Sequence, residues 1–196
     1  MAIEIELKLA VEVKDLVVLS RNLPGPTVVK KLRNIYFDTP ERSLEQGKRM
    51  LRLRIVDAAE GGILCFKGPS EHCDGVFRAE ELEWPLEADE AEAFLADPST
   101  QKARLTPLFP DLALTLLAAF GEIRVKRAVY ALGSGLQLEM DHVEYSDGSE
   151  DAELEIEAPE TRIGEARELL GRILHKSGVR AIAQERTKYQ RFLSRV

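Results

Sequence analysis

The feature that most constrains this chain is a repeated alternation of charged and apolar residues, in which the charges of one segment often share one sign. Residues 153–157 read Glu-Leu-Glu-Ile-Glu, residues 3–9 read Ile-Glu-Ile-Glu-Leu-Lys-Leu, and residues 51–55 read Leu-Arg-Leu-Arg-Ile. Successive side chains of a β-strand point to opposite faces, so each segment would present one apolar face and one ionic face. The alternation therefore predicts strands with a single apolar face, as in antiparallel sheets.

Eight segments carry the strand pattern, and helical periodicity fills the gaps between them. The predicted strands are 2–10, 32–38, 50–57, 62–67, 77–86, 122–132, 135–145 and 152–158. The predicted helices are 13–21, 89–97, 112–120, 163–177 and 185–193. Residues 146–149, Ser-Asp-Gly-Ser, have the composition of a hairpin turn, which favours antiparallel pairing. The pattern indicates an α+β fold that is mainly β.

The ionic faces carry more charge of one sign than the solvated polar face of an antiparallel sheet usually does. Side chains two residues apart on a strand lie about 7 Å apart on the same face, so a row of glutamates repels itself unless cations lie among it. Mg²⁺ or Mn²⁺ would relieve this repulsion, because both ions take oxygen ligands in octahedral geometry. The cationic side chains at positions 8, 52, 54, 67 and 78 could in turn bind phosphate oxygens.

Two folds fit this pattern. A barrel could close with its ionic faces inward, in which case the helices would cover the apolar outer faces. A sheet or sandwich could instead bury the apolar faces and leave the ionic faces in water. Periodicity alone favours the second arrangement and does not decide between them.

The overall composition excludes several classes of function. A chain of 196 residues with 44% hydrophobic content is predicted to form a single domain over residues 1–196. The net charge is −7, so we expect no nucleic-acid partner and no binding to an anionic membrane. The first 20 residues are charged and no apolar run reaches the length of a membrane span, which predicts a cytoplasmic location. Two cysteines and three histidines lack the spacing of a disulfide scaffold or a metal site.

Several short fragments follow one another in a recognisable order. The chain begins with Glu4-Ile5-Glu6-Leu7-Lys8, an E-x-E-x-K pattern. The later fragments are Tyr36-Phe37-Asp38-Thr39-Pro40, Leu51-Arg52-Leu53-Arg54, Phe66-Lys67-Gly68-Pro69, Arg78-Ala79-Glu80, Arg127-Ala128-Val129-Tyr130, Asp141, the row Glu153, Glu155 and Glu157, and Thr187-Lys188-Tyr189. The ordered set resembles the CYTH domain, also called the triphosphate tunnel metalloenzyme family. Each fragment alone is weak, but the full-length match favours the barrel over the sandwich.

The resemblance implies a closed eight-stranded antiparallel β-barrel, or tunnel, that binds triphosphate together with Mg²⁺ or Mn²⁺. It implies phosphate contacts from Lys8, Arg52, Arg54, Lys67, Arg78, Arg127 and Lys188. It implies metal ligation by Glu4, Glu6, Asp141, Glu153 and Glu155. Within these sets Glu4, Glu6 and Lys8 are the candidate catalytic residues.

Two positions stay open in this comparison. Relatives often carry a lysine where this chain has Val125, and Arg124 and Lys126 stand on either side of it. A β-bulge could bring either residue inward, and Arg124 is kept as a candidate phosphate ligand. We also expect Glu80 to be a metal ligand because it shares a face with Arg78, with Glu83, on the opposite face, as the alternative.

We expect the chain to hydrolyse inorganic tripolyphosphate, because its recognisable residues address phosphate and metal. A class IV adenylate cyclase and a thiamine triphosphatase are the alternatives within the family that it resembles. A noncatalytic polyphosphate-binding or nucleotide-binding module is a further alternative. The expected partner is a small-molecule triphosphate, and the sequence leaves a homodimer open.

Overall fold

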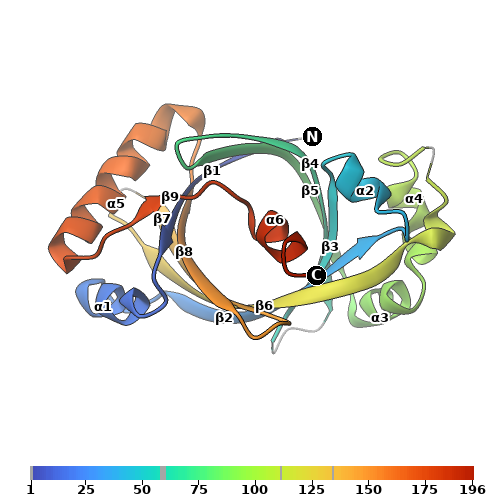
Figure 1. Ribbon diagram of the computed structural model, residues 1–196, viewed down its shortest axis with the longest axis horizontal. Coiled ribbons are helices and arrows are strands. Elements are labelled where there is room, and N and C mark those ends of the chain that lie inside the picture. Colours follow the sequence, from blue (N-terminus) through green and yellow to red (C-terminus); the bar gives the residue numbers. More distant parts are fainter. Residues whose placement is uncertain (1, 58–60, 111, 134) are drawn as a thin grey trace.

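The computed structural model of the protein describes residues 2–57, 61–110, 112–133 and 135–196. Within these residues eight long strands form one ring (Figure 1). The strands are β1 (Ala2–Val11), β2 (Val28–Asp38), β3 (Met50–Val56), β4 (Gly62–Cys73), β5 (Val76–Leu86), β6 (Ala118–Ala131), β7 (Gln137–Tyr145) and β8 (Glu150–Glu157). A short strand, β9 (Ile182–Ala183), pairs with β1 near its end.

The ring closes because β1 pairs with a long strand on each side. It pairs with β5 in a register that places Ile5 opposite Arg78, and with β8 in a register that places Lys8 opposite Glu155. The remaining neighbours follow the order β5-β4-β3-β2-β6-β7-β8, and all these pairs are antiparallel. The predicted closed eight-stranded antiparallel barrel is confirmed, and the sandwich with an apolar interior is wrong.

Most of the helices lie outside the ring, on two opposite sides of it (Figure 1). The helical elements are α1 (Asp15–Asn22), α2 (Ser43–Gln46), α3 (Ala88–Ala96), η1 (Pro98–Gln101), α4 (Lys102–Leu105), η2 (Leu114–Leu116), η3 (Glu160–Arg162), α5 (Ile163–Ser177) and α6 (Lys188–Leu193). None of them, over the residues described, is both long and apolar enough to cross a membrane.

Each outer side has its own apolar core between strands and helices. Under α1 and α5, the side chains of Leu7, Leu154 and Leu170 are fully buried. Under α2, α3 and α4, Leu53 and Phe94 are fully buried. Burying one such side chain contributes about 1.5–3 kcal/mol, so the outer faces of the strands supply the main hydrophobic stabilisation. The inner faces are therefore free to carry charge.

The last helix, α6, differs from the others because it lies within the ring (Figure 1). Its Phe192 is fully buried and stacks on Tyr36 of β2, with ring centroids 4.8 Å apart. Gly121 of β6 makes room for the helix, since a Cβ at this position would approach the Phe192 ring to 2.5 Å. A capping box between Thr187 and Gln190 begins the helix. This inner apolar contact holds α6 where its polar side chains reach the lumen.

The predicted helix over 112–120 is wrong. Only a single 3₁₀ turn forms at Leu114–Leu116, and β6 already begins at Ala118, opposite Asp38 of β2. Leu114 and Leu117 are buried in the outer core, and the following residues are held by pairing with β2. A short apolar run does not distinguish helix from strand by periodicity, so the register with β2 decides here.

Candidate active site

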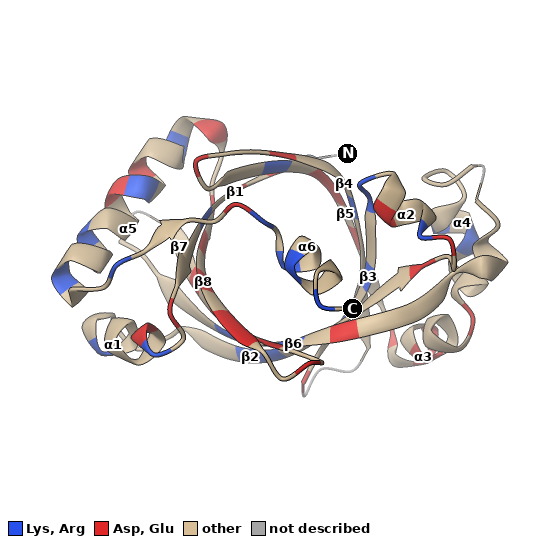
Figure 2. Ribbon diagram, in the orientation of Figure 1, with Lys and Arg blue, Asp and Glu red and all other residues tan. Residues whose placement is uncertain are grey.

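The lumen contains a cavity of about 740 Å³ whose walls are largely ionic. Figure 2 shows acidic positions along the inner wall at β8 and basic positions on α6, which lies inside the ring. The cations that line the cavity include Lys8, Arg52, Arg54, Lys67, Arg127 and Lys188. The carboxylates that line it include Glu4, Glu6, Glu81, Glu83, Glu139, Glu155 and Glu157. The ionic faces therefore enclose a common space.

Lys8 of β1 lies at the centre of the acidic wall. Its Nζ donates to Glu155 of β8 and lies 2.7 Å from Oε2 of Glu6. Burial opposes the charged form, but Glu155 and Glu6 raise the pKa of Lys8 well above its usual value. Burial likewise opposes ionisation of Glu155, yet Lys188, Lys8 and Arg127 hold the pKa of Glu155 well below its usual value. These groups stay charged because they compensate one another.

A second cluster lies deeper, where β7 and β8 meet α6. Asp141, Glu153 and Glu155 offer carboxylate oxygens within 4.8 Å of one another, and all three are buried. Lys188 contacts Glu153 and lies 2.8 Å from Asp141 and 3.0 Å from Glu155. Arg127 lies 2.6 Å from Asp141 and 2.7 Å from Glu155. Two cations from different elements thus bind one group of three acids.

The acids at the β1–β5 junction are less well compensated. Lys67 of β4 contacts Glu4, and its Nζ lies 3.4 Å from Glu81. Burial and the neighbouring Glu6 raise the pKa of Glu4 to about 8. Burial would also raise the pKa of Glu81, but its hydrogen bond with Glu4 and the charge of Lys67 lower it to about 2. Burial and the charge of Glu6 therefore disfavour the charged form of Glu4 more than Lys67 favours it.

A divalent cation fits this set of donors. Hard ions such as Mg²⁺ and Mn²⁺ take carboxylate oxygens, which is the donor type that β1, β7 and β8 present. The raised pKa of Glu4 shows that this carboxylate lacks positive charge in the protein alone. Glu6 and Asp141 instead already pair with cations, which a metal ion would have to replace. Glu4, Glu6, Asp141, Glu153 and Glu155 are the residues that could hold such an ion, as the sequence suggested.

Arg52 and Arg54 of β3 also face the cavity, yet they lack close counter-ions. Arg52 Nη2 lies 3.7 Å from Glu81 and 3.9 Å from Glu83, and Arg54 Nη1 lies 3.8 Å from Glu83. Arg52 Nε has no hydrogen-bond partner within the described part of the chain. Both guanidinium groups can therefore accept an anionic partner without giving up a close ion pair.

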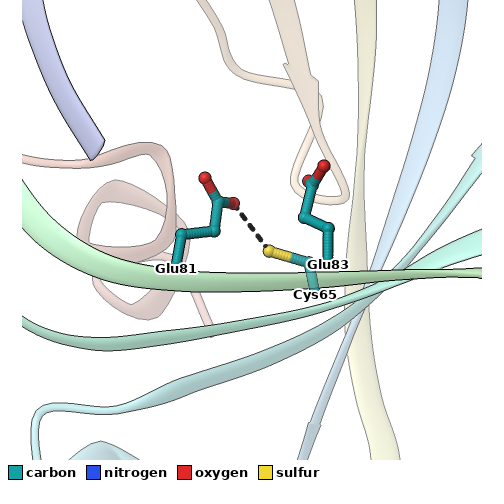
Figure 3. Close-up of side chains that lie close together, drawn as sticks. All are labelled: Cys65, Glu81 and Glu83. Atoms are coloured by element: carbon teal, nitrogen blue, oxygen red, sulfur yellow. Dashed lines mark hydrogen bonds between the residues drawn. The ribbon is translucent and has the colours of Figure 1, made fainter. Parts of the chain in front are cut away.

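Figure 3 shows Cys65 of β4 close to Glu81 and Glu83 of β5, with the Cys65 thiol pointing toward Glu81. The Cys65 thiol donates to Glu81 over 2.9 Å, and burial raises its pKa to about 12. Arg52 Nη2 donates to the same sulfur over 3.3 Å. A protonated thiol beside a guanidinium group is a poor place for a metal ion, and of these three residues Cys65 is the one that hydrogen-bonds Arg52.

Two predicted residues on β5 lie outside the tunnel. Arg78 forms a two-pronged ion pair with Glu160, at 2.6 and 2.8 Å, away from the cavity. Glu80 is exposed on the same face of β5 as Leu82, which packs against an outer core. The inner face carries Glu81 instead, and also Glu83, the alternative to Glu80. The expected phosphate contact of Arg78 and metal contact of Glu80 are corrected accordingly.

The expected contact of Arg124 is corrected for the same reason. Its side chain is 72% exposed and its nearest ion-pair partner is Glu122, on the outer face. The pairing of β6 with β7 runs without interruption from Ile123 to Ala131, so no bulge turns Arg124 or Lys126 inward. Val125 lines the cavity in their place.

Several residues at the site were not among the predicted ligands. Glu81, Glu139 and Glu157 line the cavity, and Glu139 pairs with Arg127. The alternation along β7, which also predicted Asp141, carried the signal for Glu139. Arg191 is buried on α6 beside Glu153 and follows a recognised fragment that ends at Tyr189. No local pattern marks Arg191, because its partners are distant in sequence.

Comparison with known proteins agrees with this geometry. The family profile of the CYTH domain matches residues 2–189. The protein belongs to the CYTH domain family. No match was found among curated proteins. The resemblance expected from the ordered fragments is thereby confirmed, and the enclosed cavity is the lumen of a CYTH tunnel.

Solved structures resemble this CYTH protein over almost its full length. A candidate adenylyl cyclase from Hippeastrum, described as having a dominant triphosphatase activity, is 27% identical with a TM-score of 0.89, over 97% of this chain and 95% of that one. A candidate adenylate cyclase from Bacillus halodurans is 26% identical with a TM-score of 0.77, over 98% and 99%. The PH1819 protein from Pyrococcus horikoshii is 20% identical with a TM-score of 0.66, over 97% and 99%, and shares the fold.

Proposed function

We propose that this CYTH protein is a divalent-metal-dependent triphosphatase that hydrolyses inorganic tripolyphosphate, or a similar triphosphate, and releases orthophosphate. The proposal rests mainly on one observation: a group of arginines without close counter-ions and a cluster of carboxylates lie in the same enclosed cavity. Arg52 and Arg54 have their closest ion-pair partners 3.7 and 3.8 Å away, while the acids around Glu155 form a separate, tightly paired cluster. The arginines would bind a polyanion, and the carboxylates would bind a metal ion.

The chain's own cations would bind and orient the phosphates. Arg52 and Arg54 present guanidinium forks, which suit two phosphate oxygens at once. Lys8, Arg127 and Lys188 would stabilise the negative charge that develops during phosphoryl transfer. A bound Mg²⁺ or Mn²⁺ would supply charge neutralisation and a water of lowered pKa. Glu4 and Glu6 would hold that ion beside Lys8, as the E-x-E-x-K fragment implies.

Burial of the site supports catalysis over simple binding. Lys8, Arg52, Glu153 and Glu155 are each less than 9% exposed, so charges in the lumen are poorly screened by water. Fixed charges in such a place stabilise a transition state more than the same charges in water. The Hippeastrum relative, with its dominant triphosphatase activity, favours hydrolysis as the reaction.

Adenylate cyclase chemistry is the second candidate, and the size of the cavity favours it. A volume of about 740 Å³ falls within the range of about 300–1,000 Å³ that is typical of pockets for organic ligands. A nucleoside triphosphate could therefore enter with its base and ribose. Both the Hippeastrum and the Bacillus halodurans relatives are named as candidate cyclases.

One assay separates these functions. The protein is incubated with tripolyphosphate, ATP or thiamine triphosphate in Mg²⁺ or Mn²⁺, and orthophosphate and cyclic AMP are measured. We expect metal-dependent orthophosphate release, fastest from tripolyphosphate. Cyclic AMP from ATP would indicate a cyclase, and phosphate mainly from thiamine triphosphate a thiamine triphosphatase. Tight binding of tripolyphosphate without turnover would show a noncatalytic module and contradict the proposal. Arg78→Met, on the outer face, is the matched control and should behave as wild type.

A further inference from the structure

Arg191 of α6 uses its whole guanidinium group inside the protein. Its Nε donates to Asp151 over 2.7 Å, its Nη2 donates to Glu153 over 2.8 Å, and its Nη1 donates to the backbone carbonyl of Arg186 over 2.6 Å. Tyr145 supports the arrangement by donating its hydroxyl to Asp151 over 2.7 Å. A single side chain thus joins α6 to β8 and to the segment that leads into the helix.

Glu153 is held between two residues of the same helix. Arg191 contacts its Oε2, while Lys188, one helical turn earlier, contacts its Oε1. Residues three apart on a helix lie on one face, so the two cations approach Glu153 together. Glu153 is fully buried, and removing either partner would leave a buried carboxylate oxygen without its close counter-ion.

The position of α6 depends on such contacts. The helix has six residues, and helices this short are marginal without tertiary support. Phe192 packs against Tyr36, but this apolar contact does not determine which oxygen of Glu153 Lys188 contacts. The contacts of Arg191 with Asp151 and Glu153 supply that directional constraint.

We propose that Arg191 is a positioning residue for Lys188, an inference that rests on the proposed binding of a triphosphate in the tunnel. Arg191 occupies one oxygen of Glu153 and fixes α6 on β8. Lys188 therefore stays at the cavity, where its ammonium group contacts all three carboxylates of the deeper cluster. Without Arg191, Oε2 of Glu153 keeps only the 3.4 Å hydrogen bond from Gln184 and has no cation, so it draws Lys188 away from the space where phosphate binds. Among the residues that the structure describes, the cavity wall includes Lys188 and not Arg191, so Arg191 acts through Lys188.

Arg195 provides a matched control at the end of the same helix. It lies 3.9 Å from Asp151, donates to Ser149 over 2.9 Å and covers the ring of Tyr145 at 4.0 Å. It therefore helps to attach the C-terminal end of the chain to the same β7–β8 hairpin as Arg191. The polar contacts of the Arg195 side chain are with Asp151, Ser149 and the backbone carbonyl of Arg191, and not with Glu153 or Lys188. Its removal therefore separates attachment of the chain end from positioning of the lysine.

The test is a pair of double-mutant cycles on tripolyphosphate in Mg²⁺. Arg191→Met, Lys188→Met and the double variant form one cycle, and Arg195→Met replaces Arg191→Met in the other. Both kcat and KM are measured for hydrolysis, and Kd is measured by calorimetry. We expect Arg191→Met to raise Kd and KM about tenfold, with little further loss when it is added to Lys188→Met. Arg195→Met should combine with Lys188→Met additively, and Arg191→Lys should recover part of the affinity.

Full additivity between Arg191→Met and Lys188→Met, or an unchanged Kd in folded Arg191→Met, would overturn the positioning role. If Arg191→Met does not fold by circular dichroism, the same cycle is run with Arg191→Lys, which keeps the charge but loses the fork. Wild-type protein that neither binds nor hydrolyses tripolyphosphate would refute the proposed function itself. Wild-type binding with an additive cycle would refute only the role of Arg191.

Discussion

The cations of the tunnel form two groups that differ in how closely the protein itself neutralises them. The first group makes ion pairs at or below 3 Å with carboxylates of other elements, and its members are Lys8, Lys67, Arg127 and Lys188. The second group, Arg52 and Arg54, has its carboxylate partners at 3.7 to 3.9 Å. We call these the anchored cations and the open cations.

This difference separates stability from binding. Buried acids are costly unless a cation compensates them, so the anchored cations are needed for folding before any ligand arrives. They can turn to phosphate only if another cation replaces them on the acids, which a divalent ion would do. The open cations can bind phosphate at once, because they lose no close ion pair. On the proposed function, the anchored cations would therefore need a metal ion before they could bind phosphate, and the open cations would not.

The largest expected effect follows from removing an acid beside an anchored cation. Glu6→Gln keeps the shape of the side chain but removes the charge that pairs with Lys8 and that would help to hold the metal. We expect metal-dependent phosphate release to fall by about 10²- to 10³-fold in kcat, with an unchanged circular dichroism spectrum. Glu80→Gln, on the outer face, is the control. Wild-type turnover by Glu6→Gln would remove the acidic cluster from the mechanism.

Replacing an anchored cation should lower the free energy of unfolding more than replacing an open cation. Lys188→Met leaves Asp141, Glu153 and Glu155 with less positive charge, and breaking a buried pair in this way costs about 3–5 kcal/mol. Arg54→Met removes a cation that lacks a close counter-ion, so the free energy of unfolding should not fall comparably. Urea denaturation followed by circular dichroism measures both. Equal losses would mean that the anchored and open cations do not differ.

Binding should show the opposite order. We expect Arg54→Met to raise the KM for tripolyphosphate about ten- to a hundredfold, because a hydrogen bond to a charged group contributes about 1.5–3 kcal/mol. Initial rates over a range of tripolyphosphate concentrations measure this. Arg124→Met, which removes an exposed arginine of the outer face, should leave KM unchanged. A KM for Arg54→Met equal to that of wild type would show that β3 does not contact the phosphates.

The sequence predicted which side chains share a face wherever one face of a strand was apolar, and the resemblance to the family predicted that the ionic faces line a tunnel. In the row Glu153, Glu155 and Glu157, the alternating Leu154 and Ile156 face an outer core, so the glutamates had to face the lumen. The strand β5 lacks this contrast. Residues 78–83 read Arg-Ala-Glu-Glu-Leu-Glu and carry charge on both faces of the strand. The alternation therefore did not indicate which face lines the lumen, and the resemblance selected Arg78 and Glu80, which lie on the outer face.

Long-range placement was beyond a local pattern. The helix predicted at 185–193 exists as α6, but no periodicity indicates that it lies inside a ring and not outside it. That position depends on Tyr36 and on the missing side chain of Gly121, both distant in sequence. The contacts of Arg191 with β8 arise from the same tertiary arrangement, so they too were invisible.

The smallest expected effect tests whether Arg52 is truly open. Burial raises the pKa of the Cys65 thiol to about 12, so at pH 8 this thiol stays protonated and unreactive, whereas Cys73 is exposed at the end of β4. We expect one thiol per chain to react with Ellman's reagent in the native protein and two after unfolding in guanidinium chloride. Cys73→Ser should abolish the native reaction. If Cys65 reacted in the native state, its thiolate would lie beside Arg52 as a close counter-ion, and Arg52 would then belong with the anchored cations.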